Sequence, residues 1–291
     1  MPNFSVTGSD GVLRNLHYHE RGDGDILFLL HGWYQNSLEI FSPYIDHFSN
    51  KYKVIVPDLP GHGLSYNDKS IAYSIDDACS AIVSLLEHLK AESTTVHIVG
   101  CSLGAYIALK IAIENPDLVE NVVLISLFLD FKQNELEIEK LTRLSSLPLL
   151  IALWLKARKG SFPFDGRKLR FWQYNGKMPS RWRHFLQKME NHSLYAARGY
   201  ISSFLRSSLI PGVEKNSQPT LLIYGQKDSQ TPRDFATSLA NKMTSAKLQI
   251  VDHSGHSVYL TKPNEVIKLI DEFLKENRKR RFQWLNKFWK R

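Results

Sequence analysis

The chain has little cysteine and lacks long apolar runs, and each shortage excludes a class of protein. Its 291 residues include two cysteines, Cys79 and Cys101, which cannot form a disulfide framework and which fit a reducing compartment. No apolar stretch approaches the ~18 residues that a membrane-spanning helix needs. The first fifteen residues carry no apolar signal-peptide core. We therefore expect a cytoplasmic protein.

Sequence patterns for bound phosphates and metals are also missing. Neither G-x-G-x-x-G nor a P-loop occurs, so no phosphate-cradling loop is expected. His17 and His19 would share one face of a strand, but no third ligand follows at helical or strand spacing. The sequence therefore implies no cofactor and no metal.

Charge is distributed unevenly along a chain that is apolar enough to build a sizeable core. Hydrophobic residues make up 43% of the sequence and charged residues 23%, which argues against wholesale disorder. Residues 131–212 carry 15 Lys and Arg against 5 Asp and Glu, whereas the residues before them are acidic on balance. We place boundaries where the charge changes sign. They give a core of residues 1–130 and 213–275, a helical cap of residues 131–212, and a basic tail of residues 276–291.

Short apolar runs alternate with helix-like segments in the core, which predicts an α/β fold around a mostly parallel sheet. The expected strands are residues 16–20, 26–30, 53–57, 95–100, 121–127, 220–225 and 247–252. One helix should begin at Ser74, where Asp77 completes a capping box, and another should end at Asn115-Pro116. A third helix is expected over 263–275. Between residues 127 and 219 strand-like runs vanish and helical stretches take their place, which indicates the cap.

Ser102 lies in the pentapeptide Gly-Cys-Ser-Leu-Gly, directly after the apolar run TVHIVG and directly before the helical run LGAYIALKIAIEN. A strand that turns sharply into a helix around a central serine is a nucleophile elbow. Flanking glycines suit this turn because it leaves no room for a Cβ atom beside the serine. The pattern predicts that Ser102 is a nucleophile.

A serine nucleophile needs a base and a carboxylate that orients the base, and in this kind of fold both follow the serine in sequence. Asp228 and His256 each lie a few residues past a predicted strand, at the carboxyl ends where open α/β sheets place their ligands. Asp130 is a second candidate for the acid because it also follows a strand. His253 lies three residues from His256, but the Ser-Gly-His context favours His256.

The segments LLHGW, DLPGHGLS, VGCSLGAYIAL, YGQKD and SGH together resemble the α/β-hydrolase superfamily, and specifically its cap-bearing serine hydrolases of esterase and lipase type. The resemblance implies an α/β-hydrolase fold with an inserted helical cap. It implies that Ser102 is the nucleophile, His256 the general base and Asp228 its orienting carboxylate. It also gives an oxyanion hole to the backbone N–H groups of Trp33 and Leu103.

The same resemblance makes His31, Gly32 and Trp33 an oxyanion loop beside the substrate. Serine at position 102, where haloalkane dehalogenases and epoxide hydrolases carry an aspartate, argues against both of those activities. We expect the cleavage of a small carboxylic ester with an apolar acyl part. A thioester, an amide or a C–C bond stays open as the substrate, because the cap decides it. The alternative from another functional class is a hydrolase-like receptor, which would bind a small apolar ligand with little turnover.

Residues 275–291, which contain the tail, carry 8 Lys and Arg against 1 Glu. On a helix its large apolar residues would share one face opposite basic and polar ones; they are Phe282, Trp284, Leu285, Phe288 and Trp289. This pattern suits an anionic membrane surface, contacted through residues 278–291, and a peripherally membrane-associated protein. Docking of the same face on the body is the alternative. Nucleic acid is not an expected partner, because no nucleic-acid-binding module accompanies the tail.

Overall fold

The computed structural model describes most of the core and little of the cap. The residues described are 2–8, 10–33, 36–68, 70–71, 73–90, 95–128, 196, 199–200, 203–204, 212–231 and 233–288, with only the backbone from residue 280 onward. The predicted cap, residues 131–212, lies almost entirely outside these ranges, so its division from the core stays a prediction. Asp130 also lies outside them.

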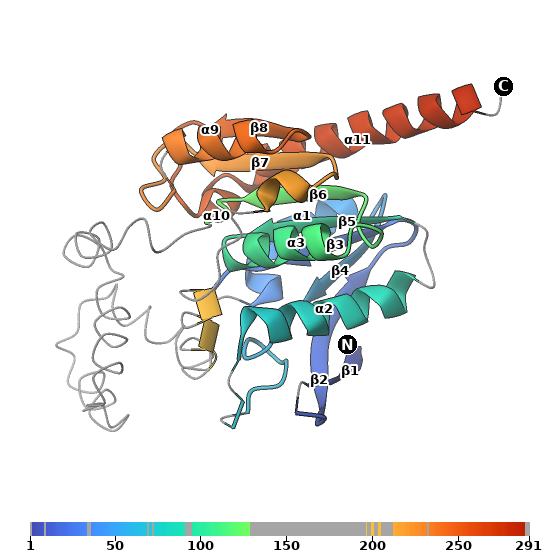
Figure 1. Ribbon diagram of the computed structural model, residues 1–291, viewed down its shortest axis with the longest axis vertical. Helices are drawn as coiled ribbons and strands as arrows, with labels where there is room; N and C mark the ends of the chain where they lie inside the picture. Colours follow the sequence, from blue (N-terminus) through green and yellow to red (C-terminus); the bar gives the residue numbers. More distant parts are fainter. Residues whose placement is uncertain are drawn as a thin grey trace.

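The described strands form one sheet in the order β1-β2-β4-β3-β5-β6-β7-β8 (Figure 1). Strand β2 runs antiparallel to β1 and β4, and every other neighbouring pair is parallel. The strands are β1 (Asn3–Thr7), β2 (Leu13–Arg21), β3 (Ile26–Leu30), β4 (Lys53–Pro57), β5 (Val96–Cys101), β6 (Asn121–Ile125), β7 (Thr220–Gly225) and β8 (Ala246–Val251). The mostly parallel sheet expected from the sequence is confirmed.

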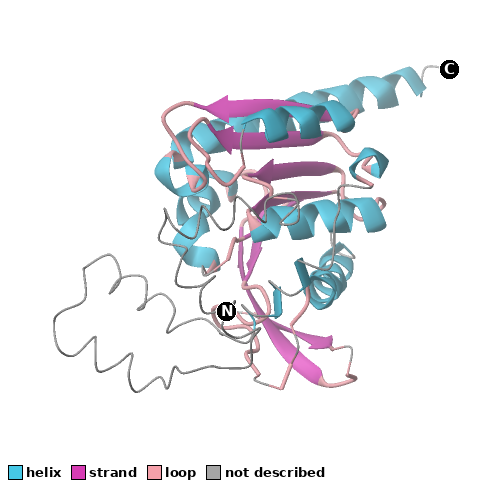
Figure 2. Ribbon diagram, turned by 60° about the vertical axis from the view of Figure 1, so that its left-hand side comes forward, coloured by secondary structure: helices cyan, strands magenta, loops and turns pink. Residues whose placement is uncertain are grey.

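Helices cover both faces of the sheet (Figure 2). Helices α1 and α11 pack on one face, and α2, α3 and α9 pack on the other. The helical elements are α1 (Ser37–Phe48), α2 (Ile75–Lys90), α3 (Leu103–Glu114), the short 3-10 turn η2 (Val213–Lys215), α9 (Arg233–Lys242), α10 (Val258–Thr261) and α11 (Pro263–Phe288). None of the helices in the described part of the chain is long and apolar enough to cross a membrane.

The central strands β3, β5, β6 and β7 are buried along their whole length. Their sequences are continuous apolar runs because both faces of a parallel sheet are covered by helices. Each buried Leu, Ile or Val side chain contributes ~1.5–3 kcal/mol relative to exposure. Strand β5, which leads into Ser102, therefore lies within a well-buried core.

Local signals set the ends of the helices that flank this core. The Ser74 Oγ accepts a hydrogen bond from the Asp77 backbone N–H at 3.0 Å, so the predicted capping box starts α2. Helix α3 ends at Glu114, just before Asn115 and Pro116, as the sequence indicates. On α11 the residues expected to face inward are buried; they are Val266, Ile270, Phe273 and Leu274.

Three elements differ from the sequence-based prediction. Strand β1 is not predicted, because NFSVT is short and mostly exposed at the edge of the sheet. Helix α1 is not predicted either, and Pro43 within it interrupts the usual helical signal. The expected helix over 263–275 continues to Phe288, so the start of the tail at residue 276 is no structural boundary. In both views the end of α11 extends past the body of the molecule (Figure 1, Figure 2).

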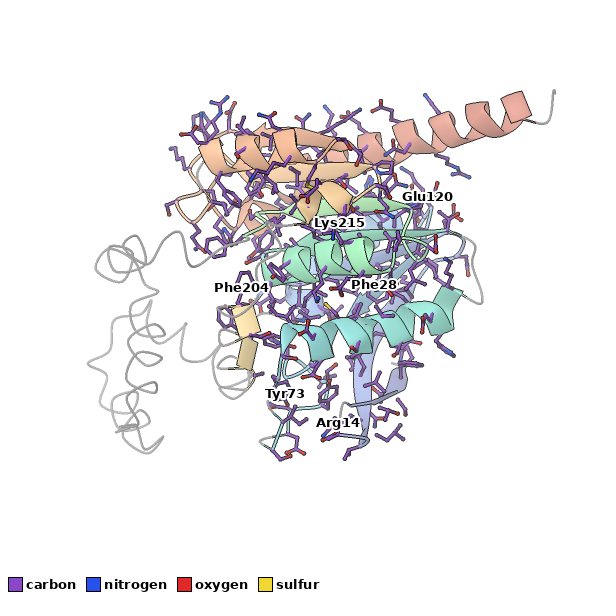
Figure 3. All side chains as sticks on the ribbon, in the orientation of Figure 1. Arg14, Phe28, Tyr73, Glu120, Phe204 and Lys215 are labelled. Atoms are coloured by element: carbon purple, nitrogen blue, oxygen red, sulfur yellow. The ribbon has the colours of Figure 1, made fainter. Side chains whose placement is uncertain are left out.

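The described residues of the cap segment contact the core near the start of α2 and α3. The Tyr200 hydroxyl donates to the Pro60 carbonyl oxygen at 3.0 Å. The Phe204 ring, labelled in Figure 3, lies 4.3 Å from the Tyr106 ring on α3, centroid to centroid. This end of the cap segment is therefore joined to the core by aromatic packing.

A tight steric constraint in the fold concerns Gly104, in the first turn of α3. A Cβ atom there would lie 2.2 Å from the Leu30 carbonyl oxygen and 2.6 Å from that of His31. Because both contacts are with backbone atoms, neither can yield by a side-chain rotation. We expect Gly104→Ala to lower the free energy of unfolding by about 1–3 kcal/mol or more, measured by urea denaturation.

Gly255→Ala is the matched control, because the added methyl group would meet its nearest neighbour, the Lys227 carbonyl oxygen, at 3.7 Å. Equal urea midpoints for the two variants would contradict the steric argument.

Candidate active site

Ser102 occupies a strained position between β5 and α3. Its φ of 52° and ψ of −113° fall where non-glycine residues are rarely found. The Ser102 N–H donates to the Ile125 carbonyl oxygen on β6 at 2.9 Å, which holds the turn against the sheet. The side chain is only partly buried, so its hydroxyl is accessible at the carboxyl edge of the sheet. The predicted strand-turn-helix around this serine is present.

His256 reaches Ser102 from the loop after β8. Its Nε2 atom lies 3.1 Å from the Ser102 Oγ, although the two residues are 154 positions apart in the sequence. The Ser126 hydroxyl donates to the His256 carbonyl oxygen at 2.7 Å and fixes the backbone of this loop. The 3.1 Å between the His256 Nε2 and the Ser102 Oγ is short enough for proton transfer between the hydroxyl and the imidazole.

Asp228 lies on the other side of the same imidazole, in the loop after β7. Its Oδ2 and Oδ1 atoms are 3.0 and 3.3 Å from the His256 Nδ1. The carboxylate also accepts the backbone N–H groups of Gln230 and Thr231 at 2.9 and 3.1 Å, and the Thr231 hydroxyl bonds to its Oδ2.

These hydrogen bonds determine the ionisation of Asp228. Burial alone would raise the pKa of this carboxyl, but hydrogen bonding and attraction to His256, together with the Thr231 and Gln230 donors, outweigh burial and lower it. An ionised carboxylate can only accept hydrogen bonds. The His256 Nδ1 therefore carries the ring proton and donates a hydrogen bond to Asp228. The Nε2 atom then presents its lone pair to Ser102. The three side chains together can deprotonate the serine hydroxyl.

Of the two histidines in this loop, His256 is the one that meets the serine. His253 is exposed, has a φ of 54°, and its backbone N–H donates to the Gln226 side chain at 3.2 Å. The alternative acid Asp130 cannot be compared in the same way, because it lies outside the described residues. The geometry of the described residues joins Ser102, His256 and Asp228.

The imidazole of His31 lies beneath the loop that contains Gly32 and Trp33. Its side chain is fully buried, and its Nε2 accepts the Leu59 N–H at 2.9 Å while its Nδ1 lies 2.7 Å from the Gly32 carbonyl oxygen. The Leu59 bond makes Nε2 the acceptor, so Nδ1 carries the proton and donates to Gly32. The His31 imidazole therefore bonds to the backbone and positions the loop. The place of His31, Gly32 and Trp33 beside the substrate stays a prediction.

The remaining expected residues surround the elbow. Leu103 is the first residue of α3, and the N–H groups of a helix's first turn have no partner within the helix. They attract negative charge, which is the property that an oxyanion hole requires. Trp33 is partly buried at the end of the Gly32 loop. The oxyanion hole assigned to the Trp33 and Leu103 amides stays a prediction.

Two residues of this site were not predicted from the sequence. Ser126 follows β6 directly and has a φ of 51°, and Thr231 lies three residues past Asp228. The position of Ser126 could have been predicted from the sequence. It directly follows β6, which pairs with β5, so it must lie at the same edge of the sheet as Ser102. The position of Thr231 could not, because a threonine in a loop is ordinary.

A separate group of residues could hold a metal ion. His17 and His19 on β2 lie with Asp58, which follows β4, and one ligand atom from each lies within 4.8 Å of the others. Spacing along β2 alone does not reveal this third ligand, because Asp58 follows a different strand.

Comparison with known proteins agrees with this geometry. The family model described as the alpha/beta hydrolase fold matches residues 25–263. A pimeloyl-[acyl-carrier protein] methyl ester esterase of Aeromonas hydrophila is 22% identical over 258 residues, covering 87% of this chain and 96% of that protein. An (E)-2-((N-methylformamido)methylene)succinate hydrolase of Acinetobacter baylyi is 23% identical over 273 residues, covering 90% of this chain and 94% of that protein.

Solved structures share the fold. An esterase from Exiguobacterium antarcticum superposes with a TM-score of 0.71 at 20% identity, covering 93% of this chain and 98% of that one. The family match spans most of the chain, from the strand before the Gly32 loop to the start of α11. The chain belongs to the α/β-hydrolase fold family.

Proposed function

We propose that this protein is a serine hydrolase that cleaves carboxylic esters with an apolar acyl part. One observation carries the proposal: Ser102, His256 and Asp228 form a continuous hydrogen-bonded chain, with Oγ to Nε2 at 3.1 Å and Nδ1 to Oδ2 at 3.0 Å. Such a chain turns a weakly nucleophilic hydroxyl into an attacking group.

The reaction has two halves in this mechanism. The Ser102 Oγ attacks the ester carbonyl while His256 accepts its proton, and the imidazolium that forms is stabilised by Asp228. His256 then gives the proton to the leaving alcohol, which leaves an acyl group on Ser102. A water molecule, deprotonated by the same imidazole, releases the acid. The N–H groups of Leu103 and Trp33 stabilise the negative oxygen in both halves.

The acyl preference is supported by aromatic residues at this edge of the sheet. Phe128 follows Ser126 by two residues, and its ring lies 6.0 Å from that of Phe204, which in turn packs on Tyr106. Phe128 and Trp33 are both partly exposed. Apolar surface of this kind favours an apolar substrate over a charged one.

The names of the relatives bear on the bond that is cleaved. The Aeromonas hydrophila protein is named as a methyl ester esterase, which supports an ester. Amide, thioester and C–C bond cleavage remain the alternatives, because the same triad performs them and the substrate-selecting cap lies outside the described residues.

Replacement of the serine tests the nucleophile. We expect Ser102→Ala to abolish labelling by a fluorophosphonate probe and to lower kcat for p-nitrophenyl esters by roughly 10⁴- to 10⁶-fold. Ser84→Ala is the control, because Ser84 lies exposed on α2 and bonds only within that helix. A wild-type protein that neither labels nor hydrolyses these esters would favour the receptor alternative instead.

Replacement of the acid separates the two candidate carboxylates. We expect Asp228→Asn to lower kcat by about 10⁴-fold with little change in KM, because an amide can donate to Nδ1 and hold the wrong tautomer. Asp130→Asn should keep near wild-type kcat. Steady-state kinetics of both variants decide between them, and the reverse pattern would move the role to Asp130.

We also propose that the basic tail brings the enzyme to an anionic membrane surface. The proposal is supported by the continuous helical backbone of α11 through Phe288, which is the conformation that the amphipathic sequence pattern needs. It is also supported by the course of α11, whose last turns extend past the body (Figure 1). Basic residues near an anionic leaflet contribute about 1 kcal/mol each.

Deletion of residues 278–291 tests this role. We expect the truncated protein to lose co-sedimentation with vesicles containing phosphatidylserine while it keeps its kcat for a short soluble ester. A full-length variant with Gln at positions 278–281 should lose most of the binding too, and raised salt should weaken the wild type. Equal vesicle binding by the truncated and full-length proteins would refute the proposed role of the tail.

A further inference from the structure

His17, His19 and Asp58 form a compact polar group away from the serine. His17 and His19 alternate along β2, so their side chains leave the same face, and their ring centroids lie 4.9 Å apart. Strand β4 pairs antiparallel with β2, and the Asp58 N–H donates to the His17 carbonyl oxygen at 2.9 Å. The ladder therefore carries Asp58 beside the two histidines, with a ligand atom of each residue within 4.8 Å of the others.

The imidazole of His17 is held in the state that binds a metal. His17 is 3% exposed, and its Nδ1 lies 3.1 Å from the Asn3 Oδ1. An amide oxygen only accepts, so Nδ1 carries the ring proton and Nε2 is left as a bare lone pair. This Nε2 atom is buried and has no hydrogen-bond partner among the residues that the structure describes. Metal-binding histidines characteristically donate their second ring N–H to a carbonyl or carboxylate oxygen in this way.

Asp58 supplies a negative charge that the backbone holds in place. The side chain is buried, and it accepts the Ser37 N–H on Oδ1 and the Leu64 N–H on Oδ2, each at 2.9 Å. Burial by itself raises the pKa of this carboxyl, but these donors outweigh burial and lower it, so the group is ionised. Each oxygen keeps a further lone pair for a cation.

His19 completes the set from a more open position. It is partly buried, and its ring lies 4.9 Å from that of His17, centroid to centroid. In their neutral forms the two imidazoles offer two ring nitrogens beside one carboxylate, which is a donor set that a divalent cation can bridge.

We propose that His17, His19 and Asp58 bind a divalent transition metal, with Zn²⁺ as the best fit to two imidazoles and one carboxylate. Bonds of about 2.0–2.1 Å require ligand atoms roughly 3.3 Å apart, so the group must contract. The partly exposed His19 side chain provides that movement. A fourth position remains for water.

The site would be structural and would act on the loop before α1. Asp58 bonds to the N–H of Ser37, the first residue of α1, and the loop that contains Gly32 leads into this helix. A metal at Asp58 ties β2, β4 and the start of α1 together. This role does not depend on the esterase proposal, and the test uses a catalytically silent protein to keep the two apart.

Metal binding is measured on full-length Ser102→Ala protein after treatment with EDTA. We expect isothermal titration with Zn²⁺ to show one strong site, and Zn²⁺ to raise Tm. Co²⁺ should give the visible absorption of a low-coordinate nitrogen and oxygen site. His17→Gln and His19→Gln should each weaken Zn²⁺ at least 100-fold, and Asn3→Ala about 10- to 100-fold through loss of the tautomer restraint.

His47→Gln is the matched control, because His47 is exposed on α1 and packs its ring on Phe48. This variant should bind Zn²⁺ like the parent, and circular dichroism confirms that each variant is folded. The proposal is overturned if the parent protein has no strong site, or if His17→Gln and His47→Gln bind Zn²⁺ equally well.

Discussion

The close approach of β5 and α3 around Ser102 is the constraint on which the rest of the site depends. A Cβ atom on Gly100 would lie 2.2 Å from the Gly104 carbonyl oxygen, and one on Gly104 would meet the end of β3. The strained φ of Ser102 persists because the buried strands on either side of β5 hold both ends of the turn. The same turn that exposes the hydroxyl also directs the N-terminus of α3 to its side. The Ser102 hydroxyl and the positive end of α3 are thus positioned by the same close approach of β5 and α3.

Two buried carboxylates stabilise the loops around this elbow in the same physical way. Asp228 accepts two backbone N–H groups from the loop after β7, and Asp58 accepts one from Ser37 at the start of α1 and one from Leu64. For Asp228 the bond and attraction to His256, with the Thr231 and Gln230 donors, outweigh burial and lower the pKa; for Asp58 the backbone donors do so. Asp228 uses its charge to orient His256. Asp58 presents its charge to His17 and His19, which is why the second group has the character of a metal site.

The sequence predicts best where a local pattern and the packing agree. Residues 26–30 and 220–225 are correctly predicted as strands, because an apolar run bounded by turns has few other structures. Ser102, Asp228 and His256 can be predicted as a group because each follows a strand, and the structure brings the three side chains together. Strand pairing is non-local, so it cannot be read from spacing alone, and the approach of Asp58 to His17 is missed for that reason. The change of charge near residue 276 does not end a helix, because the Lys, Glu and Arg residues there are strong helix formers and α11 continues through them.

The central claim is that the Ser102 hydroxyl becomes a covalent nucleophile. The most direct measurement is mass spectrometry of the protein quenched during turnover of an ester that deacylates slowly. We expect one acyl adduct, located on the peptide that contains Ser102, which disappears as the acid is released. An ester that is hydrolysed without any adduct, or with the acyl group on a different residue, would contradict the mechanism described here.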